Sequence, residues 1–130
     1  MPITPLNPPG LPEPIAPYSM GVKAGNTVYV SGVLALDGAG RTVGVGDARA
    51  QTKFVIETIE KILREGGASL RDVAFNAVII KDMADYAAVN EVYRQYFNDP
   101  PPARYCIAAK LVRDDLLVEI ASTAHTAAAG

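Results

Sequence analysis

The chain has few of the residues that most often indicate disulfide or metal chemistry. Its 130 residues include one cysteine, Cys106, one histidine, His125, and no tryptophan. A single cysteine excludes a disulfide within the chain and a metal site with several thiolate ligands. A single histidine likewise excludes a site in which one chain supplies two or three imidazoles. We therefore expect no metal centre within the chain.

Long apolar runs and clusters of like charge are also missing. No stretch approaches the ~18–20 apolar residues of a bilayer-spanning helix, and no basic, apolar leader precedes Lys23. Twelve Lys and Arg residues stand against 14 Asp and Glu residues, for a net charge of −2, and the basic residues are scattered singly. Nucleic-acid backbones need clustered positive charge, so the sequence disfavours that partner. It predicts a cytoplasmic protein with no membrane segment.

The composition that remains is typical of one globular domain, which we predict over residues 1–130. Apolar types make up 49% and charged types 20% of the chain. Seven of the ten prolines lie in residues 2–17, and proline fixes φ and lacks an N–H. We expect residues 1–17 to form an extended surface arm and residues 18–125 to form the core. The arm has two further interpretations, contact with a neighbouring subunit or a frayed terminus.

Alternating and helical patterns predict a mixture of strands and helices. Asp47 can cap a helix whose apolar residues recur at helical spacing up to Gly66-Gly67, and Asp82 or Asp85 can cap a second helix. In the second helix Tyr86, Val89, Tyr93 and Phe97 fall on one stripe. The predicted strands cover residues 20–23, 27–32, 73–80, 104–111 and 116–124, with a loop over 37–46 and the last two strands paired as a hairpin around 112–115.

This order, β-β-α-β-α-β-β, predicts an α+β fold with two helices on one face of a sheet. The three consecutive apolar residues at 78–80 indicate that the second long strand is buried on both faces. No third helix is available to cover the other face of the sheet. We therefore expect a second copy of the chain to cover it, in a homo-oligomer.

Two charged residues lie where a buried strand should be apolar. Arg104 follows a run of three prolines, and Glu119 lies between Leu117-Val118 and Ile120-Ala121. Strand alternation puts Arg104 and Cys106 on one face. If the last two strands pair as a hairpin, Glu119 opposite Ala108 shares that face, about 13 Å from Arg104 along the strands. The pair then either binds a small carboxylate and a water or forms a structural ion pair at a subunit interface.

Six further residues are candidates for the site, and each has a structural interpretation. Cys106 is either a pocket residue or a small buried apolar side chain. The backbone at Ser31-Gly32 either offers an N–H to a ligand or only turns, and Tyr18 either covers a pocket or packs in the arm. Asn90, on the stripe of the second helix, needs a partner, and backbone capping is the simplest one. His125 is most simply a solvated or capping residue.

The chain resembles a known family in six segments that occur in the right order over about residues 15–125. They are Ala16-Pro-Tyr-Ser19, Val28-Tyr-Val-Ser-Gly32, Gln51-Thr52, Tyr86-Ala-Ala-Val-Asn-Glu-Val-Tyr93, Pro102-Ala-Arg104 and Val118-Glu-Ile120. Together they are similar to the RidA (YjgF) family of enamine/imine deaminases. Phe75-Asn76, Ala103-Arg-Tyr-Cys-Ile107 and Leu117–His125 are most similar to its RutC branch, for which the implied substrate is 3-aminoacrylate. Val33 and Met20 stand where RidA proper commonly has Gln, and both are compatible with that branch.

The resemblance implies a chorismate-mutase-like fold, a homotrimer and three pockets between subunits. It implies hydrolysis of reactive enamine or imine acids to the oxo acid and ammonia, with no cofactor, in pyrimidine nitrogen degradation. Arg104 would hold the substrate carboxylate and Glu119 would orient the water. The implied pocket lining is Tyr18, Ser31, Gly32, Asn90 and Cys106.

Other functions remain open at this point. The same pocket suits a 2-aminomuconate-type deaminase, or a module that binds small carboxylates without turning them over. An RNA-cleaving or translation-inhibiting role is the least favoured, because the Lys and Arg residues are scattered and the net charge is negative.

Overall fold

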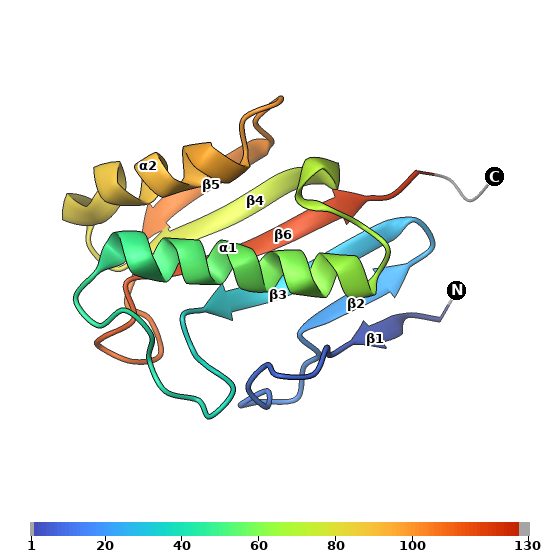
Figure 1. Ribbon diagram of the computed structural model, residues 1–130, viewed down its shortest axis with the longest axis horizontal. Helices are drawn as coiled ribbons and strands as arrows, with labels where there is room; N and C mark the ends of the chain where they lie inside the picture. The colour runs from blue at the N-terminus through green and yellow to red at the C-terminus, as the bar shows by residue number, and fades with distance from the viewer. Residues whose placement is uncertain (1, 128–130) are drawn as a thin grey trace.

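The computed structural model describes residues 2–127 and contains one mixed sheet with two helices on a single face (Figure 1). The elements are β1 (Thr4–Leu6), β2 (Gly21–Ala24), β3 (Thr27–Leu34), α1 (Ala48–Glu65), η1 (Leu70–Asp72), β4 (Val73–Ile80), η2 (Met83–Asp85), α2 (Tyr86–Tyr96), β5 (Ala103–Ala108) and β6 (Val118–His125). The predicted α+β class and the two helices on one face are confirmed. No helix within the described residues is long and apolar enough to cross a membrane.

The sheet has the strand order β1-β2-β3-β6-β4-β5. Only β4 and β5 pair in parallel, and every other neighbouring pair is antiparallel. Because β3 and β4 both run antiparallel to β6, they run parallel to each other, with α1 as the crossover between them. Helix α2 is the crossover between β4 and β5, as parallel strands require.

The predicted hairpin between the last two strands is wrong. Strand β6 does not pair with β5; it lies between β3 and β4, so β4 separates the last two strands. Residues 109–117 instead carry the chain from one side of β4 to the other. The buried Gln51 of α1 stabilises this connection, since its Nε2 donates to the carbonyl of Asp115 at 2.8 Å and its Oε1 accepts from the N–H of Leu117 at 2.8 Å.

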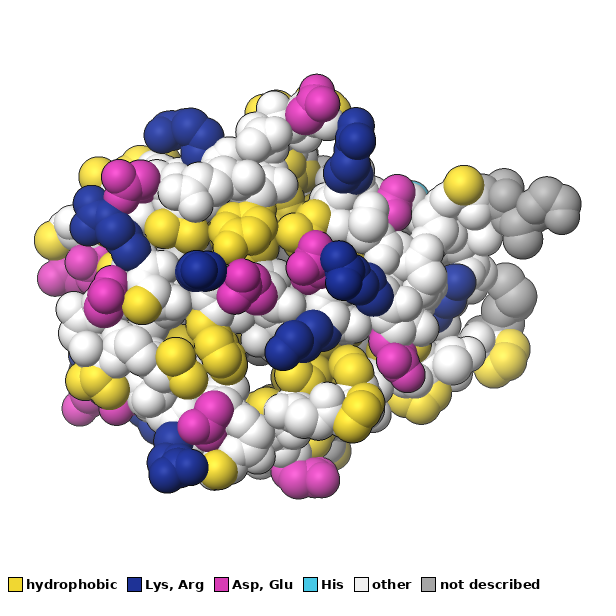
Figure 2. All heavy atoms as spheres, in the orientation of Figure 1, with side chains coloured by type: hydrophobic (Ala, Val, Ile, Leu, Met, Phe, Trp, Pro, Cys, Tyr) yellow, Lys and Arg dark blue, Asp and Glu magenta, His cyan; other side chains and the backbone are white. Residues whose placement is uncertain are grey.

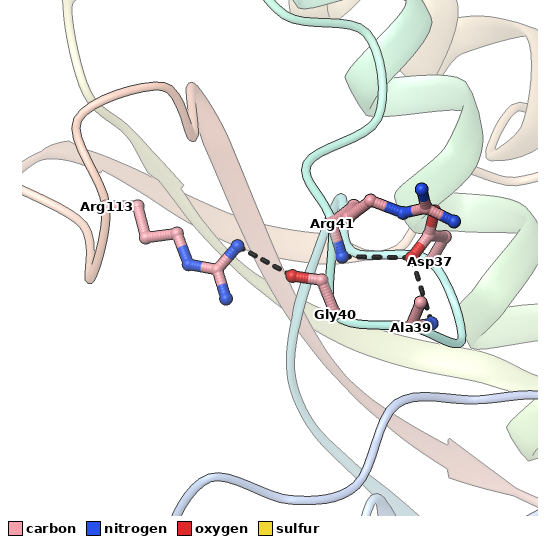
Figure 3. Close-up of polar contacts among 5 residues, drawn as sticks. All are labelled: Asp37, Ala39, Gly40, Arg41 and Arg113. Carbon is pink, nitrogen blue, oxygen red and sulfur yellow. Dashed lines mark hydrogen bonds and ion pairs between the residues drawn. The ribbon is translucent and has the colours of Figure 1, made fainter.

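A second contact ties the connection to the loop that precedes α1 (Figure 3). Asp37 Oδ1 accepts hydrogen bonds from the N–H groups of Ala39 and Arg41, both at 2.9 Å. The bond from Arg41 is the main reason that the pKa of Asp37 lies below its usual value. Arg113 donates from Nη1 to the carbonyl of Gly40 at 2.7 Å, so the loop over 37–41 and the connection hold each other.

The predicted ends of the first helix and of the strand over residues 73–80 are confirmed. Asp47 accepts from the N–H of Ala50 at 3.0 Å as the N-cap of α1, and Gly67, with φ of 79°, follows the end of that helix. Strand β4 has the predicted bounds. Asp82 caps the short η2 turn through the N–H of Ala84, and α2 follows from Asp85.

The proline-rich arm contributes a sixth strand that was not predicted. Residues Thr4–Leu6 pair with β2 at the edge of the sheet, where proline is tolerated, and Leu6 is buried against the core of its own chain. Residues Thr4–Leu6 therefore pack against the sheet of their own chain, and the frayed-terminus interpretation is wrong for them. Strand β3 also continues two residues past the predicted end at Gly32, through an irregularity between Val30 and Val33.

The hydrophobic core lies between the helices and the sheet. Its fully buried members include Ile56, Ile59, Ile62 and Leu63 of α1, with Val28, Val78, Ile80 and Ile120 of the sheet. On the helix-covered face Lys and Arg side chains are interspersed with Asp and Glu side chains (Figure 2). Charges of the two signs thus alternate over that face.

The opposite face of the sheet carries exposed apolar side chains. Tyr29, Phe75, Tyr105 and Ile107 each remain 37–49% exposed there, and Phe75 and Tyr105 contact each other edge to face with ring centroids 5.8 Å apart. The prediction that β4 is buried on both faces is therefore not fulfilled within one chain, because only its helix-facing side chains are fully buried. The uncovered face is the one for which the sequence predicts a second copy of the chain.

Candidate functional site

The guanidinium of Arg104 lies against helix α2, on the covered face of the sheet. Its Nη2 donates to Asn90 Oδ1 at 2.7 Å and to the hydroxyl of Tyr86 at 3.3 Å. Its carbon Cζ lies 4.7 Å from the centre of the Tyr93 ring and 5.8 Å from that of Tyr86. These protein contacts engage Nη2 alone, and a planar guanidinium has further N–H groups with which it can bind a carboxylate.

The charge of Arg104 is incompletely paired. Its Nη1 is buried without a hydrogen-bond partner, and no Asp or Glu within residues 2–127 forms a salt bridge with it. A buried donor without an acceptor is costly in a folded protein. Arg104 lines an open hollow of about 420 Å³ with Tyr86, Asn90, Tyr93 and Phe97. The arrangement is suited to a small anion.

Glu119 lies on the opposite face of the sheet. It pairs in register with Ile79 of β4 and with Leu34 of β3, whereas Arg104 pairs with Asn76 of β4. Since 76 and 79 differ by an odd number, the two charged side chains leave the sheet on different faces. The prediction that they share one face is wrong, because it depended on the hairpin that does not form.

The carboxyl of Glu119 is packed directly over Gly32. A Cβ built on Gly32 would lie 2.6 Å from Oε2 of Glu119 and 2.8 Å from its Cδ. A side chain at position 32 would therefore displace the carboxyl, a contact that neither interpretation of Ser31-Gly32, a ligand-binding N–H or a simple turn, had included. Burial raises the pKa of Glu119 above its usual value. A half-buried carboxyl whose pKa is raised is a stronger base than a solvated carboxylate, which suits it to proton transfer.

Ser31 and Tyr18 lie near Gly32, at the irregularity in β3. The hydroxyl of Ser31 donates to the carbonyl of Ser19 at 2.6 Å, which fixes the end of the arm beside Tyr18. Tyr18 and Gly32 line a narrow hollow together with Pro12 and Ile15 of the arm. Irregular strand positions of this kind are common beside active sites.

Cys106 follows Arg104 on the same face of β5, as the alternation predicts. Burial raises the pKa of its thiol, although the nearby charge of Arg104 opposes the effect. The thiol is thus mainly protonated at neutral pH, which is unsuitable for a nucleophile. Within residues 2–127 no three His, Cys, Asp or Glu side chains gather as a metal site would require.

Comparison with known proteins identifies the family. A family model described as Endoribonuclease L-PSP matches residues 10–126. The chain is 53% identical to the 3-aminoacrylate deaminase RutC of Acinetobacter baylyi over 125 residues, which are 96% of this chain and 99% of that protein. This chain belongs to the RidA (YjgF) family.

Solved structures agree with this assignment. RidA from a Psychrobacter species is 33% identical, with a TM-score of 0.84 over 92% of this chain and 97% of that one. TdcF of Escherichia coli, solved with bound serine, is 28% identical, with a TM-score of 0.86 over 95% and 99%. The predicted membership of the RidA family and the similarity to its RutC branch are confirmed.

The residues implied by the RidA resemblance form two groups in one chain. Arg104, Asn90 and Cys106 lie on the covered face, while Glu119, Gly32, Ser31 and Tyr18 gather at the other group near the bulge of β3. His125 is in neither group; its Nδ1 lies 3.1 Å from Thr27 Oγ1, and the residue is exposed, as its solvated interpretation predicts.

Sequence reasoning missed or misassigned three contacts of this RidA-family site. Asn90 binds Arg104 rather than the backbone, and Tyr86 is 42% exposed with its hydroxyl at Arg104 rather than buried. Tyr93 was assigned only to the core, yet its ring also faces the guanidinium. The one available signal was that all three residues share the stripe of α2 that faces β5.

Proposed function

We propose that this chain is a cofactor-independent enamine/imine deaminase that hydrolyses 3-aminoacrylate to the oxo acid and ammonia. The observation that carries the proposal is the Arg104 guanidinium, held by Asn90 and Tyr86, with a buried Nη1 that no protein acceptor satisfies. A substrate carboxylate is the natural acceptor for that edge. The 53% identity to a protein named for this reaction supports the choice of substrate.

In this mechanism Arg104 binds and orients the substrate, and Glu119 handles protons. The enamine takes a proton at carbon and gives one up from nitrogen to become the imine, and water then adds to the imine carbon. Glu119, with its raised pKa, accepts a proton from the water and returns one to the departing nitrogen. Breaking the C–N bond of the resulting carbinolamine releases ammonia and leaves the oxo acid.

The two groups of residues require a site shared between copies. Arg104 and Glu119 leave opposite faces of the sheet, so one chain cannot place both on one small substrate. We propose a homotrimer in which the uncovered apolar face around Tyr105 and Ile107 is buried, and the Glu119 group of one subunit meets the Arg104 group of the next. Such head-to-tail contacts close into rings.

Co-expression of two inactive variants tests this arrangement. Arg104→Ala and Glu119→Ala should each release no ammonia from freshly generated 3-aminoacrylate above the uncatalysed rate. When the two variants mix 1:1, a site is intact only if a Glu119→Ala subunit supplies its arginine and an Arg104→Ala subunit supplies its glutamate. This gives roughly one quarter of the wild-type activity. Co-expressed variants that stay inactive contradict the shared site, and a wild type without any acceleration contradicts deamination.

A module that only binds small carboxylates is a second candidate. The Arg104 group is complete without Glu119, which is the observation in its favour. It would bind propionate normally in Glu119→Ala, and the wild type would turn over no enamine acid. The charges of both signs on the helix-covered face give no support to RNA cleavage, and we do not propose it (Figure 2).

The setting of the reaction follows from the substrate. We propose a cytoplasmic protein, organised as a single domain, that acts in pyrimidine nitrogen degradation on 3-aminoacrylate. A longer amino-diene acid of the 2-aminomuconate type is the alternative substrate. Parallel ammonia assays with both acids, measured as kcat/KM, distinguish them.

A further inference from the structure

A buried series of hydrogen bonds leads from β6 to the Tyr93 ring that faces Arg104. The hydroxyl of Ser122 on β6 donates to Asn76 Oδ1 on β4 at 2.5 Å, and Asn76 Nδ2 donates to the hydroxyl of Tyr93 on α2 at 2.9 Å. Asn76 is 0% and Ser122 is 3% exposed. Burying polar groups in the middle of a sheet is costly unless they are paired, and here each satisfies the next.

These hydrogen bonds end at the hydroxyl of Tyr93, whose ring face supports a charge. The guanidinium carbon of Arg104 lies 4.7 Å from the centre of the Tyr93 ring, close enough for a cation–π contact. Asn76 is also the register partner of Arg104 on the neighbouring strand, so the anchor of the ring and the arginine start from adjacent backbone positions. Asn90 holds Nη2 at 2.7 Å from the side, and the ring limits rotation out of the guanidinium plane.

We propose that Tyr93 is a positioning residue for Arg104, with its ring fixed by Asn76 and Ser122. It acts through Arg104, whose guanidinium it holds in the orientation that binds the carboxylate of the substrate. Its role is thus in affinity for the carboxylate rather than in the proton transfers. The turnover part of this inference rests on the proposed deaminase function, whereas the carboxylate-binding part stands without it.

Two measurements on the full-length protein test the proposal. The first is the Kd for propionate, an unreactive carboxylate, from an NMR titration; the second is the division of any activity loss between KM and kcat with 3-aminoacrylate. Tyr93→Leu removes the ring, and we expect both KM and the propionate Kd to rise about tenfold, with kcat within about threefold of wild type. Tyr93→Met, whose unbranched and flexible side chain can adapt to the gap, should do the same and provides a second variant if the first folds poorly.

The conservative and control variants separate positioning from packing. Tyr93→Phe keeps the ring face but loses the hydrogen bond from Asn76, so its Kd and KM should rise about threefold, between wild type and Tyr93→Leu. Val92→Ala, at the next buried position of α2, should lower thermal stability without changing either constant.

Wild-type Kd for propionate in both Tyr93→Leu and Tyr93→Met overturns the proposal. An equal loss in Tyr93→Phe and Tyr93→Leu also overturns it, because the ring face would then contribute nothing. If no protein turns over 3-aminoacrylate, the deaminase proposal fails, and the propionate titration still decides the role of Tyr93.

Discussion

Replacement of Gly32 by alanine tests whether the glycine exists to make room for Glu119. The added Cβ would lie 2.6 Å from Oε2, 2.8 Å from Cδ and 3.2 Å from Cγ of Glu119. Carbon atoms pack best at ~3.5–4.0 Å, so the carboxyl has to move by about 1 Å. A misplacement of about 1 Å in a catalytic group can lower the rate about 100-fold. We expect kcat/KM for 3-aminoacrylate to fall by about that factor.

The same substitution should leave the fold almost unchanged. The atoms that conflict belong to a flexible side chain rather than to the backbone, and Gly32 is not among the glycines with positive φ. We expect the free energy of unfolding of Gly32→Ala to differ from wild type by less than about 1 kcal/mol, measured by urea denaturation.

Gly40→Ala is the matched control, since it should show the opposite pattern. Gly40 has a φ of 78° and open space around its Cα, so alanine there costs about 1–2 kcal/mol of stability and should leave kcat/KM unchanged. If Gly32→Ala folds normally and keeps the wild-type kcat/KM, the carboxyl of Glu119 is not placed by this contact, and the reasoning is refuted.

Three further predictions concern Glu119, Arg104 and Cys106. Because burial raises the pKa of Glu119, the protonated carboxyl adds stability below the unfolded pKa, and this stability is lost as pH rises through the folded pKa. Glutamine stays neutral, so Glu119→Gln should be more stable than wild type at pH 7 but not at pH 4. Thermal melts at the two pH values check this. Arg104→Lys should raise the propionate Kd about tenfold or more, because an ammonium cannot reproduce the planar contacts to Asn90 and Tyr93; an NMR titration that gives wild-type affinity contradicts this. Cys106→Ala should stay folded with near wild-type kcat/KM, because burial keeps the thiol protonated, and loss of turnover in the folded variant rules this out.

Local sequence patterns were sufficient to predict both α-helices and five of the six strands of this fold. The apolar spacing from Val55 to Leu63 and the cap at Asp47 determine α1 through short-range physics, and β4 follows from its β-branched run. The unusual positions of Arg104 and Glu119 could also be recognised, because a charge in an apolar strand is visible in the sequence alone.

Strand pairing could not be predicted in the same way. The nine residues between β5 and β6 have the composition of a hairpin loop, yet β4 lies between the two strands. That placement depends on contacts distant in sequence, such as the hydrogen bonds of Gln51 to Asp115 and Leu117. A wrong neighbour changes the register, and a shift by one residue transfers a side chain to the other face. For this reason Glu119 was assigned to the face of Arg104.

The central place of β6 affects how the protein can be made. Strands β3 and β4 both depend on β6 as a partner, and β6 comes last in sequence among the strands of residues 2–127. During translation, the hydrogen-bonding edges of β3 and β4 that will face β6 stay open until residues 118–125 have left the ribosome. Unpaired edges of this kind can join other chains. The nascent polypeptide therefore passes through a period of aggregation risk that ends only when its final strand is inserted.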